Sequence, residues 1–415
     1  MKKLIIISAV IIFLIQSIAA QTNYAIKLAE TIMATYKDSM VVKKYASHLE
    51  QDKLIPAGQT AEQAQLSRPA VWNYEMGVVL QGFEKLATFT SNNKYTGYAK
   101  NIIDHFITTE GEIRTYNVEE YNIDNIPAGR QLLHLYKNTK EEKYKTAATL
   151  LYKQLAWQPR NKIGGYWHKL KYPAQMWLDG LYMAQPFAVE YAVMFNDTEK
   201  FDDIINQFVW MEKYSRDTIT GLLYHGWDES KLQKWANPKT GLSPEFWSRA
   251  MGWYMMALVD VLDHLPANYN RRAELIAILN RLSTALVKFQ DAKEGVWWQV
   301  TDKANQQLNY LESSSSAMFL YALSKAVNKK YIGINFKPAI TKAFSGIIKK
   351  FVRVDGAGSV HYLQAVAGAG LGGIPYRDGT YDYYVKEPKR DDDLKAIGPF
   401  IQACIEYELL FPQKM

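Results

Sequence analysis

Met176-Trp177-Leu178-Asp179 leads directly into an apolar segment that is rich in small residues and has helical periodicity. Five other stretches begin in the same way, with a polar or aromatic cluster followed by such a segment. They are Val71-Trp72-Asn73-Tyr74, Tyr121-Asn122-Ile123-Asp124, Phe246-Trp247-Ser248-Arg249, Leu311-Glu312-Ser313-Ser314 and Asp391-Asp392-Asp393-Leu394. The six stretches recur about every 50 to 80 residues, which leaves room for one inner helix, one outer helix and two loops. The spacing therefore predicts six helical hairpins.

More polar amphipathic runs separate these segments and suit helices with one wet face. They lie near residues 24–37, 94–108, 140–157, 198–214, 271–290 and 337–352. We therefore expect an all-α fold, an (α/α)6 barrel in which six inner helices stand inside six outer ones and their leading ends meet at one mouth. The alternative is an open helical solenoid, whose repeats would be shorter and more alike. Ser243-Pro244-Glu245 has the pattern of a helix start, with a capping hydroxyl before a first-turn proline.

The first 20 residues differ from the rest of the chain. Lys2-Lys3 precedes the apolar run 4–14, and Ser17-Ile18-Ala19-Ala20 supplies small residues for cleavage. The pattern predicts a signal peptide over residues 1–20, a single catalytic domain over residues 21–415, and export to the periplasm or the outside. An uncleaved membrane anchor is the alternative, but the run is shorter than the ~20 residues that a spanning helix needs. We expect no stable membrane insertion after cleavage.

Charge and cysteine content exclude several classes of protein. The formal charge is +7, from 49 Lys and Arg against 42 Asp and Glu, and the charges are scattered, so we expect no nucleic-acid partner. The single cysteine, Cys404, lies in an apolar run and is interpreted as a buried small hydrophobic residue. No histidine and carboxylate pair has the H-E-x-x-H spacing, so we expect neither a metal nor another cofactor.

Two aspartates at the leading ends are candidate catalytic residues. Asp179 lies among aromatic and apolar residues near a helix start, a setting that would favour its protonated form and suit a general acid, while the helix dipole would oppose this. Asp124 lies one repeat earlier, and a carboxylate pair across a sugar site indicates glycoside hydrolysis. Each aspartate has a structural alternative as a helix N-cap.

Histidine, arginine and aromatic residues near the same ends are candidate sugar ligands. His168 and His225 lie in aromatic, loop-like surroundings and can bond a hydroxyl or a carboxylate. Arg249 has Trp247 and Trp253 beside it, which suits recognition of a carboxylate next to a stacked ring. The alternative for Arg249 is a buried salt bridge to an acid on the next inner helix.

Three stretches in matching order resemble the unsaturated rhamnogalacturonyl hydrolases of glycoside hydrolase family 105. They are Trp177-Leu178-Asp179-Gly180-Leu181-Tyr182-Met183, Tyr224-His225-Gly226-Trp227-Asp228-Glu229 and Phe246-Trp247-Ser248-Arg249-Ala250-Met251-Gly252-Trp253. The resemblance extends from about Trp72 to the C-terminus. It departs near that end, where the family pattern Asn-Asp-x-Lys-Gly is replaced by Asp392-Asp393-Leu394-Lys395-Ala396, which leaves the substrate subgroup open.

The resemblance implies an (α/α)6 barrel that removes a Δ4,5-unsaturated uronic acid from the non-reducing end of lyase-generated oligosaccharides, by hydration of the C4=C5 double bond. It makes Asp179 the general acid and base and Asp124 the second acid of the site. The substrate-binding residues that we expect are Trp72, Asn73, His168, Lys169, Met183, His225, Trp247, Arg249, Trp253 and Arg377. No metal, nucleotide or redox cofactor is needed for this reaction.

Two other classes of function stay open from the sequence. One is an inverting glycosidase that acts on saturated sugars with Asp124 and Asp179 as its carboxylate pair. The other is a non-catalytic, exported sugar-binding protein. The sugar linked to the uronate, rhamnose or another, is not specified by these motifs.

Overall fold

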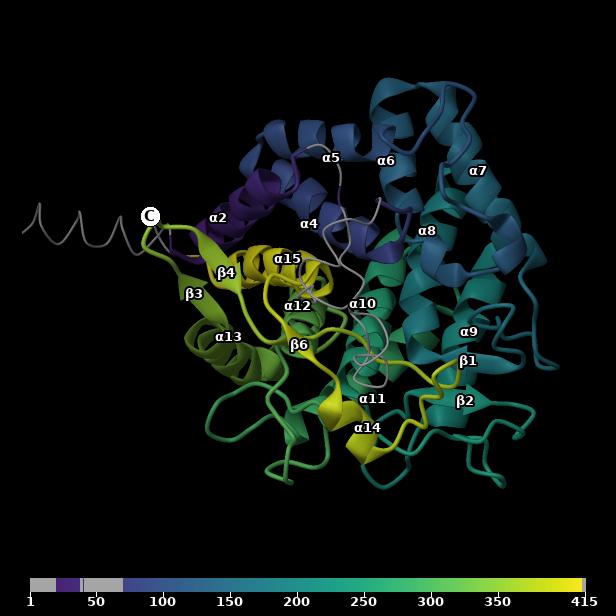
Figure 1. Cartoon of the computed structure of the whole chain (residues 1–415), viewed down its shortest axis with the longest axis vertical. Coiled ribbons are helices and arrows are strands. Elements are labelled where there is room, and N and C mark those ends of the chain that lie inside the picture. The colour runs from purple at the N-terminus through teal and green to yellow at the C-terminus, as the bar shows by residue number, and fades with distance from the viewer. Residues whose placement is uncertain (1–19, 38–39, 41–69, 413–415) are drawn as a thin grey trace, which may run out of the picture.

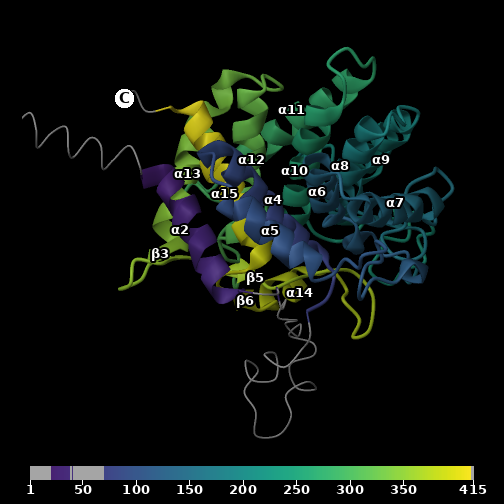
Figure 2. The ribbon, with the colours of Figure 1, turned by 90° about the horizontal axis from the view of Figure 1, so that it is seen from above.

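The computed structural model describes residues 20–37, 40 and 70–412 and shows two concentric layers of helices (Figure 1, Figure 2). The predicted signal peptide, apart from Ala20, lies outside these residues. Among the helices of the described ranges, none combines the length and the apolar character that crossing a membrane requires.

Six inner helices form a closed ring. They are α4 (Tyr74–Thr90), α6 (Gly129–Thr139), α8 (Leu178–Met194), α10 (Ser248–His264), α12 (Ser313–Asn328) and α15 (Leu394–Leu410). Each packs against the next along the chain, and α15 packs against α4 to close the ring. The all-α, (α/α)6 prediction is confirmed, and the open solenoid is wrong because the first and last inner helices are in contact.

Six outer helices cover this ring. They are α2 (Ala20–Thr35), α5 (Lys94–Asp104), α7 (Glu142–Trp157), α9 (Lys200–Ser215), α11 (Arg272–Lys288) and α13 (Lys337–Phe351). Five of them pack against the inner helix that precedes them in the chain, whereas α2 packs against α15 (Figure 1). The N-terminal and C-terminal helices are therefore neighbours.

Burial explains why the inner segments are so apolar. In α10 every residue from Ser248 to Leu262 is buried, whereas α11 buries one face only. Glycine lets inner helices approach closely: a Cβ on Gly398 of α15 would lie 2.3 Å from the carbonyl oxygen of Val78 on α4. The small residues in the inner segments are thus a packing requirement of the ring.

The six leading stretches predicted to open the inner helices do so in the structure except at the second repeat. Asn73 caps α4 by accepting from the amide of Met76 (3.1 Å), and Asp393 caps α15 by accepting from the amide of Lys395 (2.8 Å). Asp124 instead lies in a short 3-10 helix, η2 (Ile123–Asn125), and α6 begins only at Gly129.

The helix start predicted at Ser243-Pro244-Glu245 is wrong, because α10 begins at Ser248. The backbone of Trp247 is extended and forms a β-bridge with Val300, which delays the helix. The hydroxyl of Ser243 accepts from the amide of Gly226 instead (3.1 Å).

Short antiparallel strand pairs, which the sequence did not predict, link the loops between the helices. The strands are β1 (Gln175–Trp177) with β2 (Gly226–Asp228), β3 (Val352–Val354) with β4 (Val360–Tyr362), and β5 (Ala365–Val366) with β6 (Lys389–Arg390). The remaining short elements are the 3-10 helices η1 (Val118–Glu120) and η3 (Ile334–Phe336) and the helix α14 (Tyr381–Lys386). In the first pair Trp177 lies opposite Gly226. This register brings the leading end of α8 next to the segment that carries His225.

Candidate active site

Asp179 is the second residue of α8 and follows β1 directly. The amide of Leu178 donates to the carbonyl oxygen of His225 (3.0 Å), so the two segments are fixed side by side. The Nε2 atom of His225 lies 3.1 Å from Oδ2 of Asp179, although the ring is not aligned for a regular hydrogen bond. Asp179 is 9% exposed. Oδ2 of its carboxyl group therefore lies against an imidazole.

His225 is fully buried and is held by aromatic side chains. Its Nδ1 atom lies 2.6 Å from the hydroxyl of Tyr384, and its ring is 4.7 Å from that of Trp247 and 5.5 Å from that of Trp177. Burial lowers the pKa of His225, and the opposing effect of the Asp179 charge is smaller. The imidazole is consequently neutral at pH 7.

Asp124, unlike Asp179, has a lysine as well as a histidine beside its carboxyl group. Its Oδ1 lies 3.0 Å from Nε2 of His168, and its Oδ2 lies 2.5 Å from Nζ of Lys169. Burial acts to raise the pKa of Asp124, but Lys169 and His168 outweigh it and hold that pKa well below its ordinary value. Asp124 is therefore a permanent carboxylate, and the structure brings together three of the residues that the sequence predicts for the site.

Trp177 packs against both of the histidines that lie next to the two carboxyl groups. Its ring stacks on that of His168 (4.4 Å between centroids, 19° between planes) and on that of Tyr172 (5.0 Å, 26°), and its edge faces His225. Gly180 gives His168 the space that it needs, since a Cβ there would lie 3.1 Å from Nδ1 of His168. Trp177 was not among the predicted site residues, although it stands two positions before Asp179.

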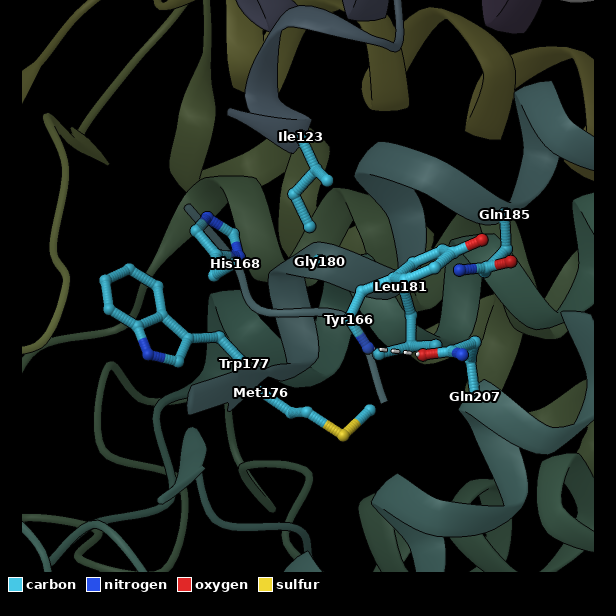
Figure 3. A pocket seen from close by; sticks show the side chains of 9 residues that line it. All are labelled: Ile123, Tyr166, His168, Met176, Trp177, Gly180, Leu181, Gln185 and Gln207. Atoms are coloured by element: carbon cyan, nitrogen blue, oxygen red, sulfur yellow. Dashed lines mark hydrogen bonds between the residues drawn. The ribbon is translucent and has the colours of Figure 1, made fainter. Parts of the chain in front are cut away.

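A small cavity lies behind His168 and Trp177 (Figure 3). Its volume is about 10 Å³, room for about one water molecule. The lining residues are Ile123, Tyr166, His168, Met176, Trp177, Gly180, Leu181, Gln185 and Gln207. It is too small to hold a sugar ring, and Asp179 is not among its lining residues.

Arg249, the second residue of α10, is fully buried. Its Nε donates to the hydroxyl of Ser314 (2.7 Å), and its Nη2 lies 3.6 Å from Oε1 of Glu312 and donates to the carbonyl oxygen of Val366. Glu312 caps α12, the next inner helix. The salt bridge that the sequence left as an alternative is thus present, and Nη1 makes no hydrogen bond with a described residue.

The aromatic residues below the mouth fill the axis of the barrel. Trp253 of α10 contacts Tyr182 of α8 (4.8 Å) and Tyr74 of α4 (6.3 Å, edge to face). Met183 is buried one turn after Asp179 on α8. These side chains form the floor beneath the candidate site and limit how deeply a sugar ring can enter.

Trp72 and Asn73 support the site from the first leading end. The indole nitrogen of Trp72 donates to the carbonyl oxygen of Asn125 (2.7 Å) and anchors the short helix that carries Asp124. The amide nitrogen of Asn73 donates to the carbonyl oxygen of Val71 (2.8 Å), while its oxygen caps α4. Both polar groups are therefore engaged with the protein backbone.

Arg377 is half-buried on the glycine-rich loop before α14. Its Nη2 donates to the hydroxyl of Tyr172 (2.7 Å) and its Nε to the carbonyl oxygen of Gly372 (2.8 Å). Its guanidinium group lies 5.8 Å from the ring centre of Trp177. The loop therefore brings a positive charge to the side of the mouth where Asp179 and His225 lie.

Two further residues of the site were missed by sequence reasoning. Tyr384 contacts His225 across 159 positions of the chain, and Gln299 joins Trp247 (3.2 Å from its indole nitrogen) to the carbonyl oxygen of Tyr384 (3.1 Å). No local pattern signals either residue. An ionised carboxylate, a second carboxyl group beside a neutral imidazole, and nearby guanidinium groups together form a site that can bind an anionic sugar and transfer a proton.

Comparison with known proteins identifies the family. A sequence model of Glycosyl Hydrolase Family 88 matches residues 47–411. The solved structure of a glycoside hydrolase from family 105 of C. acetobutylicum is 44% identical, with a TM-score of 0.80, and the match covers 81% of this chain and 94% of that one. Protein Atu3128 of Agrobacterium fabrum is 39% identical over 234 residues, 55% of this chain and 99% of that protein.

The unsaturated rhamnogalacturonyl hydrolase YesR of Bacillus subtilis is 28% identical over 269 residues, 63% of this chain and 73% of that protein. The resemblance to family 105 that the three sequence stretches carry is thus confirmed. The chain belongs to Glycosyl Hydrolase Family 88 and, with its solved relative, to glycoside hydrolase family 105, and it is a glycoside hydrolase.

Proposed function

We propose that this enzyme removes a Δ4,5-unsaturated uronic acid from the non-reducing end of lyase-generated oligosaccharides, with rhamnogalacturonan fragments as the substrate class. The observation that carries the proposal is the contrast between the two carboxyl groups: Asp124 is paired with Lys169 and His168, whereas Asp179 faces only the neutral imidazole of His225. Among the described residues no lysine or arginine forms an ion pair with Asp179. One acid is thereby available for proton transfer.

The chemistry follows from the double bond of the substrate. The C4=C5 bond of the unsaturated uronate is a vinyl ether, so a proton from Asp179 adds to C4 and the ring oxygen stabilises the positive charge at C5. Water then attacks C5 and returns a proton to Asp179, which acts as the base in this second step. The resulting hemiketal opens to a ketone, and the aglycone leaves from C1. Atoms and protons balance without a second catalytic acid.

Asp124 has a binding role in this mechanism. Since Lys169 and His168 hold it as a carboxylate, it can accept a hydrogen bond from a sugar hydroxyl or from the attacking water. It is poorly suited to serve as a proton donor. An inverting glycosidase would need Asp124 and Asp179 as an acid and base pair, and the fixed ionisation of Asp124 allows it only the role of base.

Two arginines are candidates for the uronate carboxylate. Arg377 lies on the loop beside Trp177 and is partly exposed. Arg249 offers Nη1, since its other donors are engaged with Ser314, Glu312 and Val366. A guanidinium group suits a planar carboxylate. The rhamnogalacturonan class is supported by the activity named for the Bacillus subtilis relative.

The test is the loss of the ultraviolet absorbance of the conjugated unsaturated uronate. We expect this loss on an unsaturated galacturonosyl-rhamnose disaccharide, and no product from the saturated disaccharide even at high enzyme concentration, because protonation at C4 needs the double bond. A panel of lyase products then defines the linked sugar. Release of saturated galacturonate would support the inverting glycosidase, and binding of both disaccharides without turnover would support a sugar-binding protein.

A further inference from the structure

Tyr384 occupies the far side of His225 from Asp179. Its hydroxyl lies 2.6 Å from Nδ1 of His225, and its ring stacks on that of Trp247 (5.7 Å between centroids, 22° between planes). The side-chain amide of Gln299 donates to the carbonyl oxygen of Tyr384 (3.1 Å). The tyrosine is fully buried on α14. Its hydroxyl is therefore fixed against one nitrogen of the imidazole.

The neutral imidazole has one proton for two nitrogens, and its neighbours determine which nitrogen carries it. Burial raises the pKa of the Tyr384 hydroxyl well above its ordinary value, so this group stays protonated and can donate. If Tyr384 donates to Nδ1, the proton of His225 is on Nε2, the nitrogen that lies 3.1 Å from Oδ2 of Asp179. In the other tautomer, the lone pair of Nε2 faces that oxygen.

The two oxygens of Asp179 differ in accessibility. Oδ2, next to His225, is buried, whereas Oδ1 is bonded to no described residue and is not buried. Only a proton on Oδ1 is in position for a substrate in the mouth. An Nε2 lone pair would draw the acidic proton of Asp179 to Oδ2, away from the substrate, whereas an Nε2–H group 3.1 Å from Oδ2 disfavours a proton on that oxygen.

We propose that Tyr384 is a positioning residue that holds His225 in the Nε2–H tautomer, so that Asp179 presents its acidic proton on Oδ1. The inference rests on the proposed role of Asp179 as proton donor. The same tautomer serves both steps, because an Nε2–H group 3.1 Å from Oδ2 also stabilises the negative charge of Asp179 once it has become a carboxylate. Neither the histidine nor the tyrosine changes its protonation state during the reaction.

The first experiment compares Tyr384→Phe with a matched control, Tyr254→Phe. Tyr254 is also fully buried and donates one hydrogen bond, to the carbonyl oxygen of Phe208 (2.9 Å), but it lies outside the site. Tyr384→Phe should lower kcat on the unsaturated disaccharide by roughly 10- to 100-fold, as for other partners that fix a histidine, with KM little changed. Tyr254→Phe should keep the kcat of the wild type. Equal kcat values for Tyr384→Phe and the wild type would overturn the proposal.

The second experiment reads the tautomer directly. The chain has 7 histidines, so nitrogen-15 labelling of histidine gives a small set of ring signals, and His225→Gln assigns the relevant one. The wild type should show the Nε2–H pattern, and Tyr384→Phe should shift it towards Nδ1–H. An Nδ1–H pattern in the wild type would overturn the proposal even if Tyr384→Phe fails to fold. The enzyme could instead show the Nε2–H pattern and yet leave the unsaturated disaccharide unchanged. That result would refute the proposed function but support the hydrogen bond from Tyr384 to Nδ1 of His225.

Discussion

The two ends of the inner ring differ in how fully their buried charged groups are hydrogen-bonded. Away from the mouth, Arg130 of α6 bonds Glu190 of α8 (2.6 Å) and Asp260 of α10 (2.8 Å), and Asp260 also accepts from Lys325 of α12 (2.8 Å). At the mouth, by contrast, Oδ2 of Asp179 and Nε2 of His225 lack a regular hydrogen bond.

The remaining inner helices join the network away from the mouth, because Lys85 of α4 pairs with Glu406 of α15 and lies 4.9 Å from the ring centre of Tyr321 on α12. Every inner helix thus contributes a charged side chain, and these charges are neutralised by one another. The difference indicates that buried ion pairs fix the inner helices against one another, whereas Asp179 and His225 lie close together without a regular hydrogen bond at the place where we expect proton transfer.

The largest expected effect is that of Asp179→Asn at the mouth. Turnover should fall by about 10²–10⁴-fold, the usual contribution of a general acid, because an amide cannot release the proton. The thermal unfolding midpoint should stay close to that of the wild type. Asp197→Asn is the control, since Asp197 accepts from the hydroxyl of Tyr152 (2.7 Å) in the turn after α8. Asp179 does not cap α8, whose N-cap is Trp177, so near-wild-type turnover of Asp179→Asn would show that Asp179 is not the general acid.

Asp260→Asn tests the ion-pair network that lies away from the mouth, and it should lower stability without lowering activity. Removing one partner of a buried ion pair costs about 3–5 kcal/mol, because Arg130 and Lys325 lose their shared carboxylate, and urea unfolding measures this loss. The kcat of the folded variant should remain within about twofold of the wild type. Glu30→Gln, at an exposed pair with Lys94 (2.6 Å), should cost at most about 1 kcal/mol. A large fall in kcat without a fall in the free energy of unfolding would contradict this prediction, because it would show that the ion-pair network influences catalysis.

Arg249→Lys tests a residue that is part of a buried ion pair and is also a candidate to bind the substrate. Lysine keeps the charge but has a single nitrogen, so it cannot bond Ser314, Glu312 and a uronate carboxylate together. We expect KM for the unsaturated disaccharide to rise about tenfold, equivalent to about 1.4 kcal/mol, together with a lower unfolding midpoint. A lower midpoint with unchanged KM would identify Arg249 as a purely structural ion-pair residue and leave Arg377 as the remaining candidate for the carboxylate.

The helices could be predicted from the sequence because inner helices such as α10 and α12 are buried almost all round, whereas the outer helices are buried on one face. α9 was expected near 198–214 and is observed at Lys200–Ser215. The second repeat was displaced because Asp124 belongs to a separate 3-10 turn and the inner helix starts only after it. Strands of two or three residues show no period that could distinguish them from a loop.

Several of the residues that lie together at the candidate site were named from the sequence, but their pairings were not. Asp124, His168 and Lys169 were all expected, yet nothing local shows that the latter two neutralise the first. The partner of Arg249 depends on the rotation of α10 against α12, and the contact of Tyr384 with His225 depends on how the C-terminal loop folds over the mouth. Such contacts join distant parts of the chain, so a single sequence without tertiary information cannot specify them.

The contact between α2 and α15 has a consequence for biosynthesis. The apolar stripe of α2 (Ala25, Leu28, Ala29 and Ile32) is fully buried in the finished protein, and Thr22 bonds Glu408 across 386 positions. Translation makes α2 before α15. The apolar stripe of α2 therefore stays without this partner while the intervening chain is made, and the outer layer can close only after α15 has been synthesised.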